Sequence, residues 1–219
     1  MRELKLGVHI SGRGSNLQAL IDACADNNFP AEIVLVISNV ADVEGLAKAK
    51  AAGIPTQTIP HKSFVTKEAF EMALDDAHTN AGVELICNAG FMRIISPYLI
   101  GRWRGRMINI HPSLLPSFPG LHTHQRALDA GVLFTGCTVH YVEEEVDAGA
   151  MIIQAAVPVL SNDTEESLSA RVLRFEHKAY PAAVAMIANG HVIYKDGKII
   201  RNHTDSTLEN GLLNPALLS

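Results

Sequence analysis

Short apolar runs alternate along the first half of the chain with segments whose apolar residues recur at the spacing of a helix. The apolar runs predict strands at residues 4–11, 31–38, 55–59, 83–90 and 106–110. The segments between them predict helices at residues 16–27, 42–53, 66–81 and 96–103, with Gly53 as the C-cap of the second and Thr66 as the N-cap of the third. Strands that are apolar on both faces are typical of a parallel sheet with helices on each side.

The pattern changes in the second half of the chain. The long runs "FTGCTVHYV" and "AMIIQAAVPVL" flank the acidic stretch "EEEVDAG" and predict an antiparallel extension of the same sheet. A long helix is predicted over residues 163–190, with Asp163 as its N-cap and Glu166 as the capping-box partner. Pro181 should kink this helix or mark a break in it. The pair Asp196-Gly197 predicts a tight hairpin in the segment that follows.

Together these elements predict one α/β domain with a Rossmann-like, mostly parallel sheet, helices on both faces and an antiparallel C-terminal extension. We expect the domain to comprise an N-terminal half, residues 1–108, and a second half, residues 109–201. Residues 202–219 form a tail without a clear pattern, for which fraying and packing against a partner are both open.

Composition narrows the class of protein. The 219 residues are 47% hydrophobic and 19% charged, which suits a globular domain with a sizeable core. The net charge of -5 and the lack of a basic block disfavour nucleic acid as a partner. The sequence has neither an apolar run long enough to span a membrane nor a signal-peptide pattern. Three scattered cysteines indicate a reducing, cytoplasmic setting.

A small polar loop, "SGRGSN" (residues 11–16, the first loop), separates the first predicted strand from the first helix. Ligands collect at the carboxyl ends of strands in such sheets, and a helix N-terminus offers N–H groups and partial positive charge to a phosphate. Gly14 would let the backbone approach a ligand closely, and Ser15 and Asn16 would add side-chain donors. Equally, the loop could be a tight turn in which Ser15 or Asn16 caps the helix.

Larger nucleotides fit the first loop less well. A dinucleotide fingerprint would need glycine where Leu17 stands, and an acidic residue where Ser38 and Asn39 end the second strand. The sequence also lacks the G-x-x-x-x-G-K-[ST] run of a P-loop. A phosphate monoester therefore suits this loop better than NAD or ATP, and a nicotinamide oxidoreductase is disfavoured.

A second candidate site lies in "NIHPSLLPSFPG", where Asn109 and His111 end a predicted strand and should share one face. An amide can stabilise the oxygen of a tetrahedral intermediate, and an imidazole can transfer protons near neutral pH, as acyl transfer requires. Pro112, Pro116 and Pro119 would stiffen the loop around this pair. A purely structural strand end with capped turns is an equally open alternative.

A catalytic histidine usually has a carboxylate that orients it, and the acidic stretch "EEEVDAG" offers candidates. Asp147 is favoured because Ala148-Gly149 turns the chain back toward the sheet. The histidines at positions 122, 124 and 140 lack the cysteine or carboxylate partners of a zinc site, so we predict no metal.

Seven segments, in order from about residue 4 to about residue 200, together resemble the phosphoribosylglycinamide formyltransferase family of purine synthesis. They are "SGRGSNLQALIDA", "ISN", "AGFMRI", "NIHPSLLPSFPGLHTHQRAL", "GCTVHYV", "VDAG" and "EHKAYP". The resemblance implies transfer of a formyl group from 10-formyltetrahydrofolate, as co-substrate, to the amine of glycinamide ribonucleotide. We expect small-molecule substrates as partners, without nucleic acid or membrane, and a monomer or homodimer.

The resemblance assigns roles to residues in both halves of the chain. The catalytic trio would be Asn109, His111 and Asp147. The N-terminal half would bind the substrate phosphate, the second half would hold catalysis and the folate, and the substrate-binding residues would be Gly14, Ser15, Asn16 and Glu176. The folate would be bound by Lys67, Met92, Arg93, Ile94, Ile95, Asn109, Glu143, Glu144, Glu145, Val146 and Asp147.

Some of these assignments have structural alternatives. Arg93 could be a surface charge at a strand end, and Glu176 could be an ordinary helix residue. Lys67 stands where the family often has an arginine, and lysine lacks the arginine fork, so its contact with the folate glutamate is open.

Other functions compete with the transferase. A hydrolase, that is a deformylase, could pass the same formyl group to water with the same trio. A deformylase needs no phosphate loop, however, and related deformylases carry an extra N-terminal domain. Enzymes that formylate initiator tRNA carry a further C-terminal domain, for which the residues after Ile200 are too few. A non-catalytic module for a sugar phosphate would keep "SGRGSN" without needing the catalytic trio.

Overall fold

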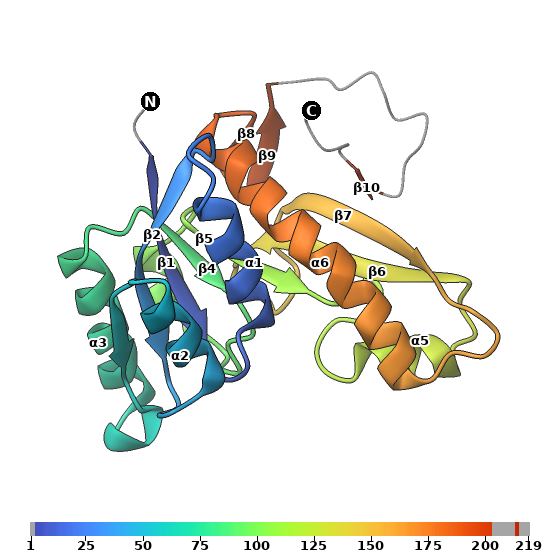
Figure 1. Cartoon of the computed structure of the whole chain (residues 1–219), viewed down its shortest axis with the longest axis horizontal. Coiled ribbons are helices and arrows are strands. Elements are labelled where there is room, and N and C mark those ends of the chain that lie inside the picture. Colours follow the sequence, from blue (N-terminus) through green and yellow to red (C-terminus); the bar gives the residue numbers. More distant parts are fainter. Residues whose placement is uncertain (1–2, 203–212, 215–219) are drawn as a thin grey trace. The chain divides into compact units, whose positions relative to one another are not determined.

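The computed structural model describes residues 3–202 and 213–214. The chain divides into two compact units (Figure 1). The first unit holds the residues up to Asn109 and the short segment Val142–Glu144, and the second holds Ile110–Tyr141 and the residues from Glu145 onward. The boundary passes through strand β5 (Met107–His111), whose last two residues belong to the second unit.

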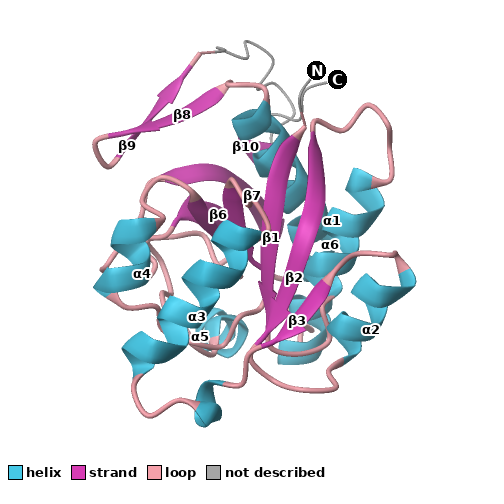
Figure 2. Ribbon diagram, turned by 90° about the vertical axis from the view of Figure 1, so that its left-hand side faces the viewer, coloured by secondary structure: helices cyan, strands magenta, loops and turns pink. Residues whose placement is uncertain are grey.

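The first unit is a parallel sheet with helices on both faces. Its strands pair in the order β5-β4-β1-β2-β3. Besides β5 they are β1 (Leu4–Ile10), β2 (Ala31–Ser38), β3 (Thr56–Thr58) and β4 (Leu85–Asn88). Figure 2 shows α1 and α2 on one side of β1–β3 and α3 and α4 on the other. These helices are α1 (Ser15–Cys24), α2 (Glu44–Ala51), α3 (Lys67–Asn80) and α4 (Pro97–Arg102), with a short 3-10 helix, η1 (His61–Ser63), before α3.

This strand order explains why a ligand site belongs at one edge of the first unit. The chain runs outward from β1 through β2 to β3, and then returns to the other side of β1 to form β4 and β5. The direction of winding therefore reverses between β1 and β4, and ligands of such sheets bind in the crevice beyond the carboxyl ends of these strands. The segments that follow β1 and β4 flank this switch point.

The second unit contains an antiparallel pair, β6 (Phe134–Tyr141) and β7 (Met151–Pro158), and a helix that packs across it, α6 (Glu165–Ala188) (Figure 1). The predicted tail contains a short strand, β10 (Leu213–Asn214), which pairs with β7. The other tail residues after Asn202 lie outside the described residues. A separate hairpin joins β8 (Val192–Lys195) to β9 (Lys198–Arg201), and helix α5 (Thr123–Asp129) precedes β6.

The structure confirms the predicted α/β architecture, including the antiparallel extension. Thr66 caps α3 as predicted, because its hydroxyl accepts a hydrogen bond from the backbone N of Ala69 at 3.1 Å. The hairpin turn at Asp196-Gly197 is also confirmed, since both residues have the positive φ that a type I′ turn requires. Gly53 adopts a left-handed conformation one residue after Ala52, which is the actual C-cap of α2.

Both capping residues predicted for the long helix were wrong. The N-cap of α6 is Thr164 rather than Asp163, and Ser167 rather than Glu166 completes the capping box. Asp163 instead forms a bidentate ion pair with Arg171, at 2.6 and 2.7 Å. Its carboxylate therefore binds a side chain within the helix rather than capping the helix N-terminus. Pro181 does not break the helix, because α6 continues through it to Ala188.

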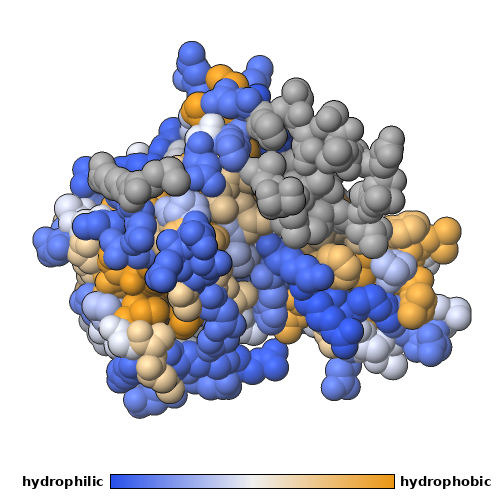
Figure 3. Space-filling model, turned by 45° about the horizontal axis from the view of Figure 1, so that its top comes forward, coloured by the Kyte–Doolittle hydropathy of each residue, from blue (hydrophilic) through white to orange (hydrophobic). Residues whose placement is uncertain are grey.

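The described surface is mixed in polarity. On the face drawn in Figure 3, hydrophobic areas are divided from one another by hydrophilic residues. Among residues 3–202 and 213–214, no helix is long and apolar enough to cross a membrane. Two exposed apolar side chains, those of Met92 and Ile94, follow β4 at the edge where a ligand is expected.

Candidate active site

The first loop reaches α1 through a glycine in a left-handed conformation. Gly14 is the N-cap of α1, with φ 65° and ψ 43°, and no side chain caps this helix. The alternative in which Ser15 or Asn16 caps α1 is therefore wrong. Amide groups at an uncapped helix N-terminus are well suited to an anion such as a phosphate.

Helix α2 holds the first loop in place. The backbone N of Gly45 donates to the carbonyl of Gly12 at 3.1 Å, and the Lys48 ammonium donates to the carbonyl of Arg13 at 2.8 Å. A Cβ atom on Gly14 would lie 2.8 Å from the Cα of Gly45, closer than real side chains approach. The loop thus depends on glycine for its backbone conformation and for its packing on α2.

The segment after β4 contains four predicted folate residues, Met92, Arg93, Ile94 and Ile95. The side chains of Met92 and Ile94 are 70% and 72% exposed, whereas Ile95 packs against the buried core of the first unit. Arg93 is exposed as well. Exposed apolar groups at the carboxyl end of a strand offer a surface to a flat organic ligand.

Lys67, at the start of α3, forms a long ion pair with Glu71, with 3.9 Å between its ammonium nitrogen and the carboxylate. Glu71 in turn accepts a hydrogen bond from the backbone N of Ser96 at 2.8 Å. The structure therefore connects Lys67, through Glu71, to the end of the segment that carries Met92–Ile95.

The predicted acidic residues are divided between the units. In the first unit, Glu143 and Glu144 both lie near the Arg104 guanidinium, at 3.5 and 3.6 Å. In the second unit, Glu145 and Val146 are exposed residues of the turn that leads to Asp147. The two glutamates that pair with Arg104 are thus partly neutralised, whereas Val146 presents an apolar side chain.

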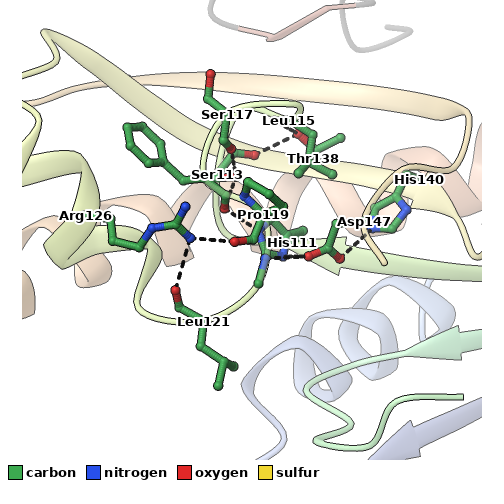
Figure 4. A network of polar contacts seen from close by, with 12 residues as sticks. His111, Ser113, Leu115, Ser117, Pro119, Leu121, Arg126, Thr138, His140 and Asp147 are labelled. Atoms are coloured by element: carbon green, nitrogen blue, oxygen red, sulfur yellow. Dashed lines mark hydrogen bonds and ion pairs between the residues drawn. The ribbon is translucent and has the colours of Figure 1, made fainter. Parts of the chain in front are cut away.

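In the second unit the structure brings His111 and Asp147 together (Figure 4). His111 is 5% exposed, and its Nδ1 lies 3.3 Å from a carboxylate oxygen of Asp147. Its Nε2 lies 3.0 Å from the carbonyl oxygen of Phe118. Both ring nitrogens therefore face acceptor oxygens, an arrangement in which a doubly protonated ring can donate twice.

The Asp147 carboxylate has further partners besides His111. Its backbone has a φ of 59°, a left-handed conformation that aspartate tolerates better than most residues. The oxygen that faces His111 also accepts a hydrogen bond from the backbone N of Gly120 at 2.8 Å. The other oxygen lies 3.7 Å from Nε2 of His140, so the carboxylate stands between two imidazoles (Figure 4).

His140 was missed as a site residue, since the sequence suggested it only as a metal candidate. Burial lowers its pKa, although a hydrogen bond to the Tyr141 carbonyl and the charge of Asp147 oppose this shift. Its position near the end of β6, shortly before the acidic stretch, was the available signal. Among the described residues, no group of three or more His, Cys, Asp or Glu side chains is placed to hold a metal ion.

A hydrogen-bond network organises the loop between β5 and α5, which follows His111 (Figure 4). The Thr138 hydroxyl donates to the carbonyl of Ser113 at 2.7 Å and accepts from the backbone N of Leu115 at 3.1 Å. The Arg126 guanidinium donates to the carbonyl of Pro119. The peptide bond between Leu115 and Pro116 is cis. The hydrogen bonds thus fix the loop through side chains from β6 and α5.

Asn109 on β5 and Glu176 on α6 are the two remaining predicted site residues. Asn109 precedes His111 by two residues on β5, so both side chains emerge on the same face of that strand. Glu176 lies on α6 in the second unit and is 7% exposed. Burial, followed by the nearby Glu176 carboxylate, raises the pKa of Cys137, so this thiol is a poor nucleophile.

Comparison with known proteins defines the class. The family model of the formyl transferases matches residues 4–184, and the chain belongs to this family. The chain is 44% identical over 189 residues to the phosphoribosylglycinamide formyltransferase of Escherichia coli (strain K12), covering 86% of this chain and 89% of that protein. A crystal structure of glycinamide ribonucleotide transformylase 1 from Symbiobacterium toebii is 41% identical, with a TM-score of 0.88 over 91% of this chain and 94% of that one.

Longer proteins contain a similar segment. The chain is 54% identical over 198 residues to the trifunctional purine biosynthetic protein adenosine-3 of Gallus gallus. This match covers 90% of the chain but 20% of the chicken protein. Across six such trifunctional relatives the chain spans 14–20% of their length.

Proposed function

We propose that the chain transfers the formyl group of 10-formyltetrahydrofolate to the amine of glycinamide ribonucleotide, a step of purine biosynthesis. The observation that carries this proposal is the pairing of Asp147 with the buried His111, at the end of β5, in a chain of the formyl transferase family. The Escherichia coli relative, similar over 89% of its own length, is named for this activity, which supports the choice of substrates.

The proposed reaction needs no covalent intermediate with the protein. The substrate amine attacks the formyl carbon and a new C–N bond forms, while the formyl oxygen takes up negative charge. Asn109 donates a hydrogen bond to this oxygen, and His111, when protonated, stabilises it electrostatically. The bond from the formyl carbon to the donor nitrogen then breaks, and the proton lost by the amine reaches that nitrogen through His111 or through a water held by Asp147.

The remaining predicted residues bind the two substrates. Gly14, Ser15 and Asn16 would hold the substrate phosphate at the uncapped N-terminus of α1. The buried Glu176 carboxylate would accept hydrogen bonds from the ribose hydroxyls. The folate would lie against the residues after β4 and in the acidic turn, namely Lys67, Met92, Arg93, Ile94, Ile95, Asn109, Glu143, Glu144, Glu145, Val146 and Asp147.

We further propose that these two small molecules are the substrates of the chain in the cytoplasm, where it acts as a monomer or a homodimer. The three scattered cysteines support the cytoplasmic setting, and the net charge of -5 disfavours nucleic acid as a partner.

A spectrophotometric assay tests the proposal. The absorbance of the folate is followed on mixing the protein with 10-formyltetrahydrofolate, with and without glycinamide ribonucleotide. We expect deformylation of the folate only when the ribonucleotide is present. Release of formate at the same rate without it would instead identify a hydrolase, and tight binding of the ribonucleotide without turnover would identify a binding module.

A further inference from the structure

Ser11 is the first residue after β1 and also the first residue of the first loop. It makes two hydrogen bonds to the segment that follows β4. Its backbone N donates to the carbonyl of Gly90 at 3.1 Å, and its hydroxyl oxygen accepts from the backbone N of Met92 at 2.8 Å. Ser11, in the segment after β1, thus links it to the segment after β4, and these two segments flank the switch point of the first unit.

The direction of these bonds fixes the serine hydroxyl. A backbone N–H can only donate, so the Ser11 oxygen accepts from Met92 and its own proton points elsewhere. That proton goes to the side-chain oxygen of Asn39, at 2.5 Å, and the Asn39 amide nitrogen lies 3.2 Å from Nδ1 of His61. Asn39, which follows β2, is 4% exposed. Because the buried Asn39 amide accepts the hydroxyl proton, a lone pair of the Ser11 oxygen is left to accept from the Met92 N–H.

The other end of the segment is also anchored. Ser96 donates to the carboxylate of Glu71 with its backbone N at 2.8 Å and with its hydroxyl. Glu71 is 2% exposed, so this anchor is buried. Residues 92–95, which we call the donor loop, are therefore held by α3 at one end and by Ser11 at the other. Between these anchors the side chains of Met92 and Ile94 remain exposed.

We propose that Ser11 is a positioning residue that fixes the place of the donor loop relative to the first loop. This inference rests on the proposed function, because it takes the two loops to bind the folate and the substrate phosphate. Without the hydroxyl, the backbone N of Met92 loses its acceptor, and the exposed side chains of the loop lose their fixed placement. Ser11 acts on the loop and touches neither reacting group.

The test compares Ser11→Ala with Ser161→Ala, which removes an exposed hydroxyl in the second unit. We expect Ser11→Ala to raise the KM for 10-formyltetrahydrofolate about fivefold, the ratio that corresponds to one neutral hydrogen bond. We expect its kcat to stay within about twofold of wild type, since the hydroxyl does not contribute to the chemical step. Ser161→Ala should match the wild type in both constants. An unchanged donor KM in Ser11→Ala, or a loss confined to kcat, would overturn the assignment.

A second pair of variants separates positioning from general damage to the fold. Asn39→Asp keeps an acceptor for the Ser11 hydroxyl and should retain a donor KM near that of wild type. Asn39→Leu removes the acceptor and should raise the donor KM as Ser11→Ala does. Equal effects of the two substitutions would contradict the role of the hydrogen-bond chain.

Equilibrium titration with an unreactive deaza analogue of the donor makes the readout independent of turnover. Wild-type protein that binds the analogue but transfers no formyl group would refute the proposed function. Wild-type protein that transfers the group, together with a Ser11→Ala variant that binds the analogue equally well, would refute the role of Ser11 alone.

Discussion

Asp147 combines a left-handed backbone with a carboxylate that faces several groups at once. One oxygen receives the Gly120 N–H and lies near His111, and the other lies near His140. Phe118, whose carbonyl faces the second nitrogen of His111, also has a positive φ, of 54°. Such a conformation is unusual for a bulky residue, and strained backbone of this kind gathers at functional sites.

The variant Asp147→Asn tests the charge at this position without disturbing the backbone, because asparagine also tolerates a left-handed conformation. It should lower kcat on the order of a hundredfold or more, the loss typical of removing one group that stabilises the transition state. Steady-state kinetics would measure this, with Asp129→Asn on the exposed face of α5 as the matched control. A folded Asp147→Asn protein with near-normal kcat would remove Asp147 from the mechanism.

Gly14 should be intolerant of a side chain, whereas Gly12 should accept one. Alanine at position 14 would be strained at φ 65° and would place its Cβ 2.8 Å from the Cα of Gly45. A Cβ at position 12 would meet nothing within 4 Å. We expect Gly14→Ala to lower the free energy of unfolding by roughly 2 kcal/mol in urea titrations. Equal stability of Gly14→Ala and Gly12→Ala would contradict the strained packing of the first loop on α2.

Residue patterns predicted part of the candidate site and missed the rest for identifiable reasons. Asn109 and His111 were proposed because a strand period of two puts them on one face, and Asp147 because a turn follows it; the structure pairs His111 with Asp147. His140 and the carbonyl of Phe118 were not found, because their contacts with Asp147 and His111 depend on how β6 and the proline-rich loop fold back. The sequence places His140 close to the acidic stretch, but no local pattern encodes the contacts themselves.

Among the elements, the strands and helices were easier to predict than their ends. Continuous apolar runs identified β1, β2 and β4, because a strand buried on both faces has little room for polar residues. The start of α6 was misassigned by one residue, since Asp163, Thr164, Glu166 and Ser167 can all serve in a capping box. Asp163 does not cap the helix because its carboxylate binds the guanidinium of Arg171, which lies one turn beyond Ser167.

Strand β1 and helix α3 meet through a buried pair of histidines. Nε2 of His9 lies 2.7 Å from Nε2 of His78, and Nδ1 of His9 lies 2.9 Å from the side-chain oxygen of Asn88. Burial lowers the pKa of His9 to about 4, and it lowers the pKa of His78 well below its ordinary value of 6.5. Both rings are therefore neutral in the folded protein at neutral pH.

This pair should make the protein less stable in mild acid. Between pH 6.5 and about 4 the unfolded chain binds protons at His9 that the folded protein cannot bind, so the free energy of unfolding falls as the pH falls. Each such histidine contributes a slope of at most about 1.4 kcal/mol per pH unit. Urea titrations at several pH values would measure the slope. The double variant His9→Leu/His78→Leu should reduce it, and an unchanged slope would contradict this account of the pair.

At the scale of the whole molecule, the order of motifs along the chain identified the family, whereas residue chemistry alone left the function open. An amide, an imidazole and a carboxylate serve a transferase and a hydrolase equally well, because water and an amine differ only as nucleophiles. The family match over residues 4–184 shows that the chain belongs to the formyl transferases. The first loop, with its uncapped helix N-terminus, is what favours a phosphorylated acceptor over water.

The most direct test of the central claim follows the formyl group itself. Isotope-labelled 10-formyltetrahydrofolate is mixed with the protein and glycinamide ribonucleotide, and the fate of the label is measured by nuclear magnetic resonance. We predict that the label passes into the amide of the formylated ribonucleotide in equal amount to the folate consumed, with no free formate. Label that appears as formate, at a rate independent of the ribonucleotide, would contradict the proposed transfer.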